Sequence, residues 1–344
     1  MRKNSGIARL VCVFAICIAL IGYNAYSFCF KGRSAKNVFT QASVNEETAL
    51  TEETPDAKTE SGETSLAEES TESTPASTDG SVKGKVISRY ISPYNAGLSY
   101  NGVYMKNSTD LEINIKELLS SSIGFKIAKN NSPQVLIVHT HTTETYMTEE
   151  ADYYTSAFSS RTRDAQKNMV SVGNIVADKL NNAGIKTLHD ATEHDYPNYT
   201  GSYSRAAKTI NSYLKKYPTI KIVLDLHRDA VSSGNSDKVK LVTEINGKKA
   251  AQVMLVMGSQ SGSVTNFPKW KENLKLAVRL QQKIEQKYPT LARPLSLMPK
   301  NYNESLTTGS LLIEFGTDAN TLAEAHYSAE LVGEAIAELL GELT

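Results

Sequence analysis

The most constraining stretch of this sequence is a short apolar run that changes at once into ligand-type side chains. The run Val135-Leu-Ile-Val138 contains only β-branched residues and leucine, as expected for a strand buried on both faces of a parallel sheet. His139, His141 and Glu144 follow directly. Because ligands bind beyond the carboxyl ends of the strands in an open α/β sheet, we predict a functional site at the end of this strand.

Two later stretches repeat this arrangement. Residues 220–226 predict a second apolar strand, which contains Asp225 and delivers His227 at its end. Residues 311–315 predict a third strand, which delivers Glu314. The carboxyl ends of parallel strands meet at one edge of a sheet, so we expect these side chains to form one site.

The remaining pattern alternates helices with strands. Helices are predicted at 164–183, 203–217, 268–287 and 321–340, strands at 185–188, 239–245, 251–257 and 295–298, and a strand followed by a helical turn at 111–119. Asn246-Gly247 predicts a hairpin that extends or edges the sheet. The expected fold is therefore α/β, with a single open, mostly parallel sheet and helices on both faces.

The first 85 residues have a different character. Residues 1–34 contain an apolar run from 10 to about 30, long enough for a transmembrane anchor, and the basic residues before it favour a cytoplasmic N-terminus. A cleaved signal peptide is the alternative, because residues 10–22 match the length of its apolar region. Residues 35–85 are rich in Ser, Thr and Glu and predict a disordered acidic linker. The catalytic domain is expected at 86–344.

Composition excludes two classes of site. The 37 basic and 37 acidic residues balance, so nothing indicates nucleic acid as a partner. The three cysteines, Cys12, Cys17 and Cys29, all precede the predicted domain. That domain therefore contains neither a disulfide nor a cysteine zinc site.

The candidate site residues are of the types that bind zinc in proteins. A catalytic zinc takes three protein ligands and keeps one open position, and His141 and His227 are the best imidazoles for this role. The third ligand is Glu144, or His139, which alternates in phase with His141, or a residue of the helix at 164–183. Asp225 is either an acceptor that orients a ligand histidine or a cap or edge partner.

Glu314 is the candidate general base. A carboxylate on an apolar strand is costly unless it is paired or functional, and strand alternation places Leu312 and Glu314 on one face. The alternative is an ion pair of Glu314 with an arginine such as Arg228 or Arg293. Arg228 and Asn303 are further candidates for contact with a substrate.

Several motifs in combination resemble the stage II sporulation protein P family of membrane-anchored peptidoglycan hydrolases. They are VHTHTTETY at 138–146, DLHRDA at 225–230, YNESL at 302–306, and LIEFG at 312–316 with Asn320. The resemblance covers residues 86 to the end. More distantly, the pattern is similar to the zinc N-acetylmuramoyl-L-alanine amidases, which take a zinc ligand from a glutamate on the helix after the first strand. Asn168 stands there in this chain, and this departure favours Glu144 as the third ligand.

The resemblance implies a zinc-dependent hydrolase that cleaves the amide between N-acetylmuramic acid and the L-alanine of the stem peptide. It also implies endopeptidase activity on peptide crosslinks and a role in septal remodelling and engulfment during sporulation. Separately, the positive charge of Arg228 beside the metal suits contact with a stem-peptide carboxylate. The expected location is the mother-cell membrane at the septum, single-pass, with the catalytic domain outside the cytoplasm. The expected partners are a glycan-cleaving sporulation protein and a multi-pass membrane protein. A zinc carboxypeptidase-like exopeptidase and a non-catalytic wall-binding scaffold are the alternatives.

Overall fold

The computed structural model describes residues 80–234 and 236–344. The anchor predicted at 1–34 lies outside the described residues, as does most of the linker predicted at 35–85. The first strand begins at Val82, before the predicted start of the domain at 86. No helix in the described part of the chain is both long and apolar enough to cross a bilayer.

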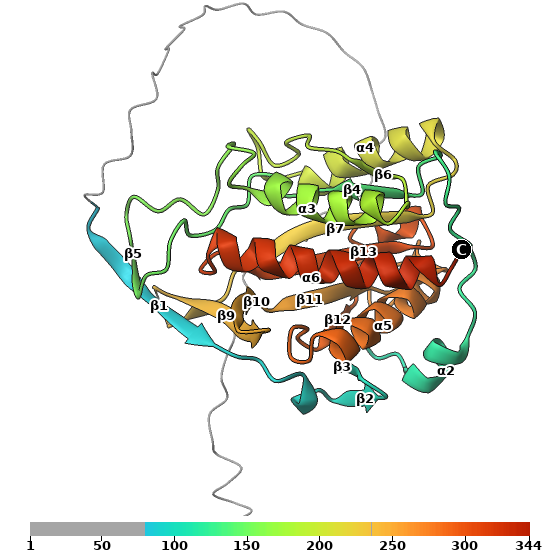
Figure 1. Ribbon diagram of the computed structural model, residues 1–344, viewed down its shortest axis with the longest axis horizontal. Coiled ribbons are helices and arrows are strands. Elements are labelled where there is room, and N and C mark those ends of the chain that lie inside the picture. The colour runs from blue at the N-terminus through green and yellow to red at the C-terminus, as the bar shows by residue number, and fades with distance from the viewer. Residues whose placement is uncertain (1–79, 235) are drawn as a thin grey trace, which may run out of the picture. The chain divides into compact units, whose positions relative to one another are not determined.

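The larger of two sheets has eight strands in the order β2-β3-β12-β11-β13-β7-β4-β6 (Figure 1). Their bounds are β2 (Leu98–Tyr100), β3 (Val103–Asn107), β4 (Val135–Val138), β6 (Thr187–His189), β7 (Ile222–Asp229), β11 (Val253–Gly258), β12 (Leu295–Met298) and β13 (Ser310–Thr317). Neighbouring strands run parallel except in the pairs β2–β3 and β11–β13. The sheet is therefore mixed and largely parallel.

The prediction of a single sheet is wrong, because a second sheet has the order β10-β9-β1-β5, with β8 on β9. Its strands are β1 (Val82–Arg89), β5 (Tyr153–Thr155), β8 (Ser232–Ser233), β9 (Asp237–Ile245) and β10 (Lys248–Ala251). The predicted hairpin forms at Asn246 and Gly247, whose φ angles are 52° and 75°. The second strand of the hairpin, β10, ends at Ala251, and the next strand of the chain, β11, belongs to the main sheet. Between them, the buried Gln252 side chain accepts a hydrogen bond from the Ile91 N–H and donates to the Ile91 carbonyl, which fixes the change of sheet.

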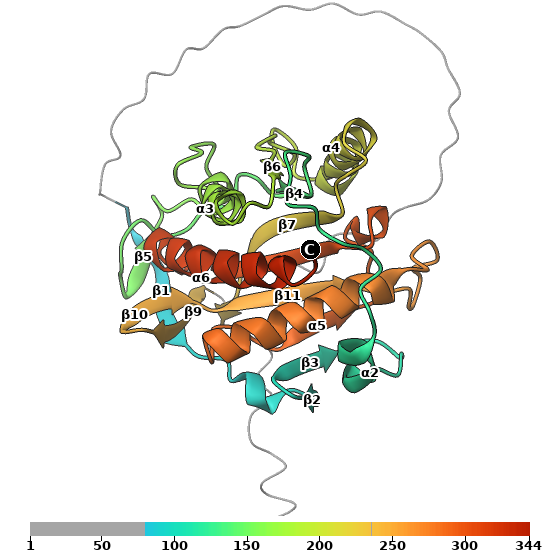
Figure 2. The same cartoon turned by 45° about the vertical axis from the view of Figure 1, so that its right-hand side comes forward.

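Helices cover both faces of the main sheet. They are α2 (Ile115–Ser120), α3 (Met169–Asn182), α4 (Ser202–Lys216), α5 (Trp270–Lys287) and α6 (Leu322–Gly341), with short 3₁₀ turns η2 (Pro93–Asn95) and η3 (Glu304–Leu306). Figure 2 shows α3, α5 and α6 on the same side of the sheet. The largest difference at a helix start is in α3, which begins at Met169 rather than 164 because Asn168 caps it, and residues 111–114 form no strand.

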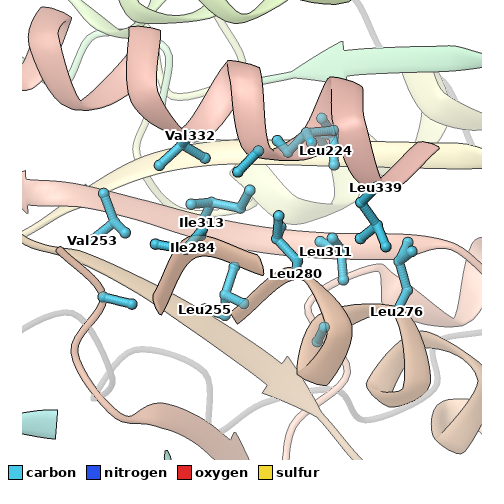
Figure 3. Close-up of a cluster of buried hydrophobic side chains, with 14 of the residues drawn as sticks. Leu224, Val253, Leu255, Leu276, Leu280, Ile284, Leu311, Ile313, Val332 and Leu339 are labelled. Atoms are coloured by element: carbon cyan, nitrogen blue, oxygen red, sulfur yellow. The ribbon is translucent and has the colours of Figure 1, made fainter. Parts of the chain in front are cut away.

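Strand alternation divides the core between the two faces. Val135 and Ile137 of β4 pack into the main core under α3, α5 and α6, whereas Leu136 and Val138 pack against Ile210 of α4. Figure 3 shows the main core, where side chains of α5 and α6 meet those of β7, β11 and β13. The opposite face of β11 and β13 carries a separate small cluster of Met254, Val256 and Leu312, with Met298 and Tyr302 against it. This second face is where the candidate site lies.

Asn320 links the two sheets by hydrogen bonds, and its replacement should lower the stability of the fold. Its buried side chain accepts hydrogen bonds from the N–H groups of Leu241 (3.2 Å) and Thr317 (2.9 Å), and it donates to Leu241 O (3.1 Å) and Glu324 (2.8 Å). Asn320→Ala removes the partner of the N–H groups of Leu241 and Thr317, at about 1–3 kcal/mol each, whereas Leu241 O and Glu324 keep other partners. We expect a loss of about 3 kcal/mol in unfolding free energy by urea titration. Asn130→Ala in an exposed turn should change it by less than about 0.5 kcal/mol, and a similarly small loss for Asn320→Ala would contradict this role.

Candidate active site

The predicted residues of β7 and β13 meet through the register of the two strands. These strands are parallel neighbours, with Leu312 opposite Asp225 and Glu314 opposite His227. Val138, the last residue of β4, lies opposite Asp225 on the other side of β7. Both His227 and Glu314 lie within their strands, whereas the sequence predicted His227 just past a strand end. Cross-strand pairing therefore places an imidazole beside a carboxylate on one face of the sheet.

A cavity of about 30 Å³ opens at this position. His141, Glu144, His227 and Glu314 all line it, together with Tyr203 and Tyr302. Leu312 lines it as well, so the predicted sharing of one face by Leu312 and Glu314 is confirmed. The structure thus brings the four principal candidates together in a space that holds one water-sized species.

The surroundings of His141 keep its imidazole neutral. Its ring stacks on that of Tyr199 at 4.5 Å, and Nε2 forms a hydrogen bond with the Tyr199 hydroxyl at 3.1 Å. Nδ1 is buried and has no hydrogen-bond partner. Burial, reinforced by the neighbouring His227, holds the pKa of His141 well below its usual value. A neutral ring with one free nitrogen is what a metal ligand requires.

His227 lies between two carboxylates. Its Nε2 is 2.9 Å from Asp225 Oδ1, without the alignment of a good hydrogen bond, and its Nδ1 is 3.8 Å from Glu144 Oε2. Burial alone would lower the pKa of His227, but Asp225, Glu144 and Glu314 outweigh it and raise that pKa to about 9. The expected contact between Asp225 and His227 is present. Asp225 is itself fixed by the N–H (2.8 Å) and hydroxyl (2.6 Å) of Thr140.

Glu144 is buried among cationic groups. Its Oε2 accepts a hydrogen bond from the Arg228 N–H at 3.2 Å. Its Oε1 lies 3.7 Å from Arg161 Nη2 and 3.8 Å from Arg228 Nη1. These contacts hold the carboxylate in place at the cavity, beside His227.

Glu314 is a buried carboxylate, and its Oε2 has no hydrogen-bond partner. Burial and the nearby Asp229 raise the pKa of Glu314 to about 8, against the opposing effect of His227. The ion pair offered as the alternative is not found among the described residues, because Arg293 pairs with Asp229 at 2.9 Å. Glu314 therefore faces the cavity with an Oε2 that has no hydrogen-bond partner in the described part of the chain.

The expectation that His139 faces the site beside His141 is wrong. The strand ends at Val138, and alternation turns His139 toward α3. Its Nδ1 lies 2.9 Å from Leu226 O, its Nε2 lies 2.8 Å from His189 Nε2, and burial lowers its pKa to about 3. The turn that follows carries His141 to the other side.

Two other candidates are occupied by internal contacts. The Arg228 guanidinium is buried and donates to the carbonyls of Thr145 (3.0 Å) and Ser160 (2.6 Å), so it fastens the loop after β4. Asn303 donates from Nδ2 to Tyr203 O at 2.8 Å, which ties its turn to α4. Arg228 nevertheless lines the cavity, whereas Asn303 is not among the residues that line it.

Sequence reasoning missed three tyrosines around the cavity. Tyr199 holds His141, and Tyr203 and Tyr302 line the cavity. The signal for Tyr302 was its place in the YNESL motif, where Tyr302 and Asn303 adopt left-handed φ angles of 50° and 59°. Nothing in the local pattern marked Tyr199 or Tyr203, because hydrophobic periodicity carries no information about which loop covers a site.

The donor set fits zinc in kind. Among residues 80–234 and 236–344, no three His, Cys, Asp or Glu side chains converge closely enough, as they stand, to enclose a metal ion. However, His141 Nδ1 and Glu314 Oε2 are buried without hydrogen-bond partners around one cavity, which His227 also lines. Buried polar atoms of this kind are costly unless something binds them. Two imidazoles and a carboxylate are also the ligand types that zinc takes in catalytic sites.

Comparison with known proteins identifies the family. The family model for stage II sporulation protein P matches residues 19–337. The chain belongs to the stage II sporulation protein P family. A curated relative, stage II sporulation protein P of Bacillus subtilis strain 168, is 28% identical over 219 residues, which are 60% of this chain and 50% of that protein. The match thus spans about half the length of that relative.

Solved amidase structures are similar in fold. The CwlD amidase from Clostridioides difficile, in complex with the GerS lipoprotein, is 9% identical, covers 61% of this chain and 99% of its own, and gives a TM-score of 0.38. The N-acetylmuramoyl-L-alanine amidase AmiC2 of Nostoc punctiforme is 13% identical over 63% of this chain and 97% of its own, with a TM-score of 0.36. At these scores the likeness does not decide the function.

Proposed function

We propose that this chain is a zinc-dependent peptidoglycan hydrolase that cleaves the amide between N-acetylmuramic acid and the L-alanine of the stem peptide. We further propose endopeptidase activity on peptide crosslinks, in septal remodelling and engulfment during sporulation. The observation that carries the proposal is the unpaired, buried Glu314 beside His227, in a cavity that His141 and Glu144 also line. Membership of the sporulation family supports the cellular role.

Each residue of the site has a part in this chemistry. His141, Glu144 and His227 would hold zinc, which when bound polarises the scissile carbonyl and makes water a stronger nucleophile. Glu314 accepts the proton of the attacking water and returns it to the leaving amide nitrogen. Burial raises the pKa of Glu314, which makes its carboxylate a stronger base. Asp225 holds the ring of His227 in place.

Product analysis tests this proposal. The full chain should release intact stem peptides from purified sacculi and leave the glycan strands whole, as measured by mass spectrometry. A chelator should stop the release, and added zinc should restore it. Release of single amino acids would instead identify an exopeptidase. The absence of any release, with sacculi still bound, would identify a wall-binding scaffold.

Replacement of Glu144 tests the third ligand. Glu144→Ala should weaken zinc binding by more than about 100-fold, because losing residues that only support a ligand already costs 10- to 100-fold. Zinc content after dialysis against a competing chelator measures this. The matched control is Glu193→Ala, which removes a partly exposed partner of Arg163 and should leave zinc unchanged. Full zinc occupancy in Glu144→Ala would exclude Glu144 as the third ligand.

We also propose that residues 1–34, which lie outside the described residues, anchor the chain in a membrane with the catalytic domain outside the cytoplasm. By family resemblance this is the mother-cell membrane at the septum, where a glycan-cleaving sporulation protein and a multi-pass membrane protein are the partners. Full-length protein should sediment with membranes, resist salt extraction and be released by detergent. A soluble mature protein that starts after residue 30 would identify a cleaved signal peptide instead.

A further inference from the structure

Two phenol groups face the candidate site from different elements. Tyr203 is near the start of α4 and Tyr302 precedes η3, yet both line the cavity with His227 and Glu314. Their ring centroids are 6.2 Å apart. The Tyr203 ring also meets that of His141 edge-on, with centroids 5.7 Å apart. The two rings therefore form one wall of the site.

Neither hydroxyl has a hydrogen-bond partner in the part of the chain that the structure describes. The Tyr146 hydroxyl, in contrast, donates to Phe315 O at 2.9 Å, and the Tyr199 hydroxyl bonds His141. Within residues 80–234 and 236–344, the hydroxyls of Tyr203 and Tyr302 make no hydrogen bond. Both side chains are half-buried, and packing alone would be served equally by phenylalanine. The two phenols thus offer unused donors beside Glu314.

Other donors of the cavity are committed or more distant. The Arg228 guanidinium is occupied by the carbonyls of Thr145 and Ser160. Ser296 is the third hydroxyl in the lining, but it stands on β12, with β11 between it and the strand of Glu314. Tyr203 and Tyr302 are therefore the uncommitted donors next to the reacting groups.

The structure fixes the two phenols relative to each other. Tyr302 and Asn303 hold left-handed φ angles of 50° and 59°, a strained conformation that persists only when its surroundings impose it. Asn303 imposes it by donating to Tyr203 O at 2.8 Å, and Glu304 accepts from the Gly258 N–H at 2.8 Å. Donors held in place before reaction are the kind that stabilise a developing charge.

We propose that the hydroxyls of Tyr203 and Tyr302 donate hydrogen bonds to the carbonyl oxygen of the scissile amide, a role that rests on the proposed function. Water adds its oxygen to the carbonyl carbon, its proton passes to Glu314, and the C=O π electrons move onto the carbonyl oxygen. The two phenols stabilise the negative charge there and keep their own protons. The C–N bond then breaks as Glu314 returns the proton to nitrogen, which leaves a carboxyl group and an amine.

Removing the hydroxyl oxygen of one tyrosine at a time, in the full chain, tests this role. Tyr203→Phe and Tyr302→Phe should each lower kcat for stem-peptide release by about 10- to 10³-fold, up to the usual effect of removing one such donor. Zinc content and melting temperature should stay unchanged. Tyr213→Phe is the matched control, because this tyrosine lies farther along α4 and bonds Asp190 rather than facing the cavity. It should keep the wild-type rate.

A binding measurement supplies a second readout. In the inactive Glu314→Gln chain, calorimetry with N-acetylmuramoyl-L-alanyl-D-isoglutamine should show binding weakened about threefold or more by either phenylalanine substitution. Wild-type rates and binding in both variants would overturn the tyrosine role and leave the proposed function standing. A rate loss that follows a loss of zinc or of melting temperature would overturn it too, as a structural effect. A wild-type chain that releases no stem peptides would overturn the proposed function, and the tyrosine role with it.

Discussion

Glu314→Gln should lower the rate of stem-peptide release by about 10²–10⁴-fold, the usual share of general acid–base catalysis. Glutamine keeps the size of the side chain but cannot accept a proton. Zinc content and melting temperature should stay near wild type, because Glu314 makes no ion pair in the described part of the chain and its Oε2 has no hydrogen bond to lose. Rate, zinc and melting measured on one variant separate the possible roles of this carboxylate.

A second buried carboxylate provides the contrast for Glu314. Glu324 pairs with Lys240 at 2.8 Å and closes the capping box of α6 with Thr321. Glu324→Gln should therefore lower the melting temperature while the folded enzyme keeps its rate. If Glu314→Gln gave this same pattern, Glu314 would be structural. If it lost zinc, Glu314 would be a ligand, and full activity would exclude the mechanism proposed above.

His141→Ala and His227→Ala should each remove most bound zinc and all measurable hydrolysis. Both rings line the cavity, with centroids 5.2 Å apart and planes at 89°. A catalytic zinc has only three protein ligands, so the two that remain hold it poorly. Zinc content by mass spectrometry and stem-peptide release measure the two effects.

Two other histidines serve as controls for this loss. His139→Ala should keep zinc but lower stability, because it empties a buried position between Leu226 and His189, on the side of α3. His326→Ala on α6, where the ring contacts Ser171, should keep both zinc and activity. Full zinc in either the His141 or the His227 variant would contradict their assignment as ligands.

Local pattern located the strands that carry the candidate site. Apolar runs located β4, β7 and β13, and these strands carry or immediately precede His141, Glu144, His227 and Glu314. Alternation placed Leu312 and Glu314 on one face, and Asn246-Gly247 formed the hairpin. These features depend on neighbours in the sequence, since the period of a strand and the φ angles of a turn are set by a few consecutive residues.

The tertiary structure alone decided which residues from distant parts of the sequence come into contact. The second strand of the hairpin divides at Gln252 between two sheets, because Ile91, far away in the sequence, binds that side chain. His139 faces away from the cavity and His141 faces into it, because β4 ends at Val138 and the turn that follows breaks their alternation. Tyr203 and Tyr302 converge from α4 and the turn before β13, about a hundred residues apart, through the contact of Asn303. The alternation of apolar residues determines on which face of its own strand a side chain lies. Strand pairing and loop packing between residues far apart in the sequence determine which other side chains lie against that face.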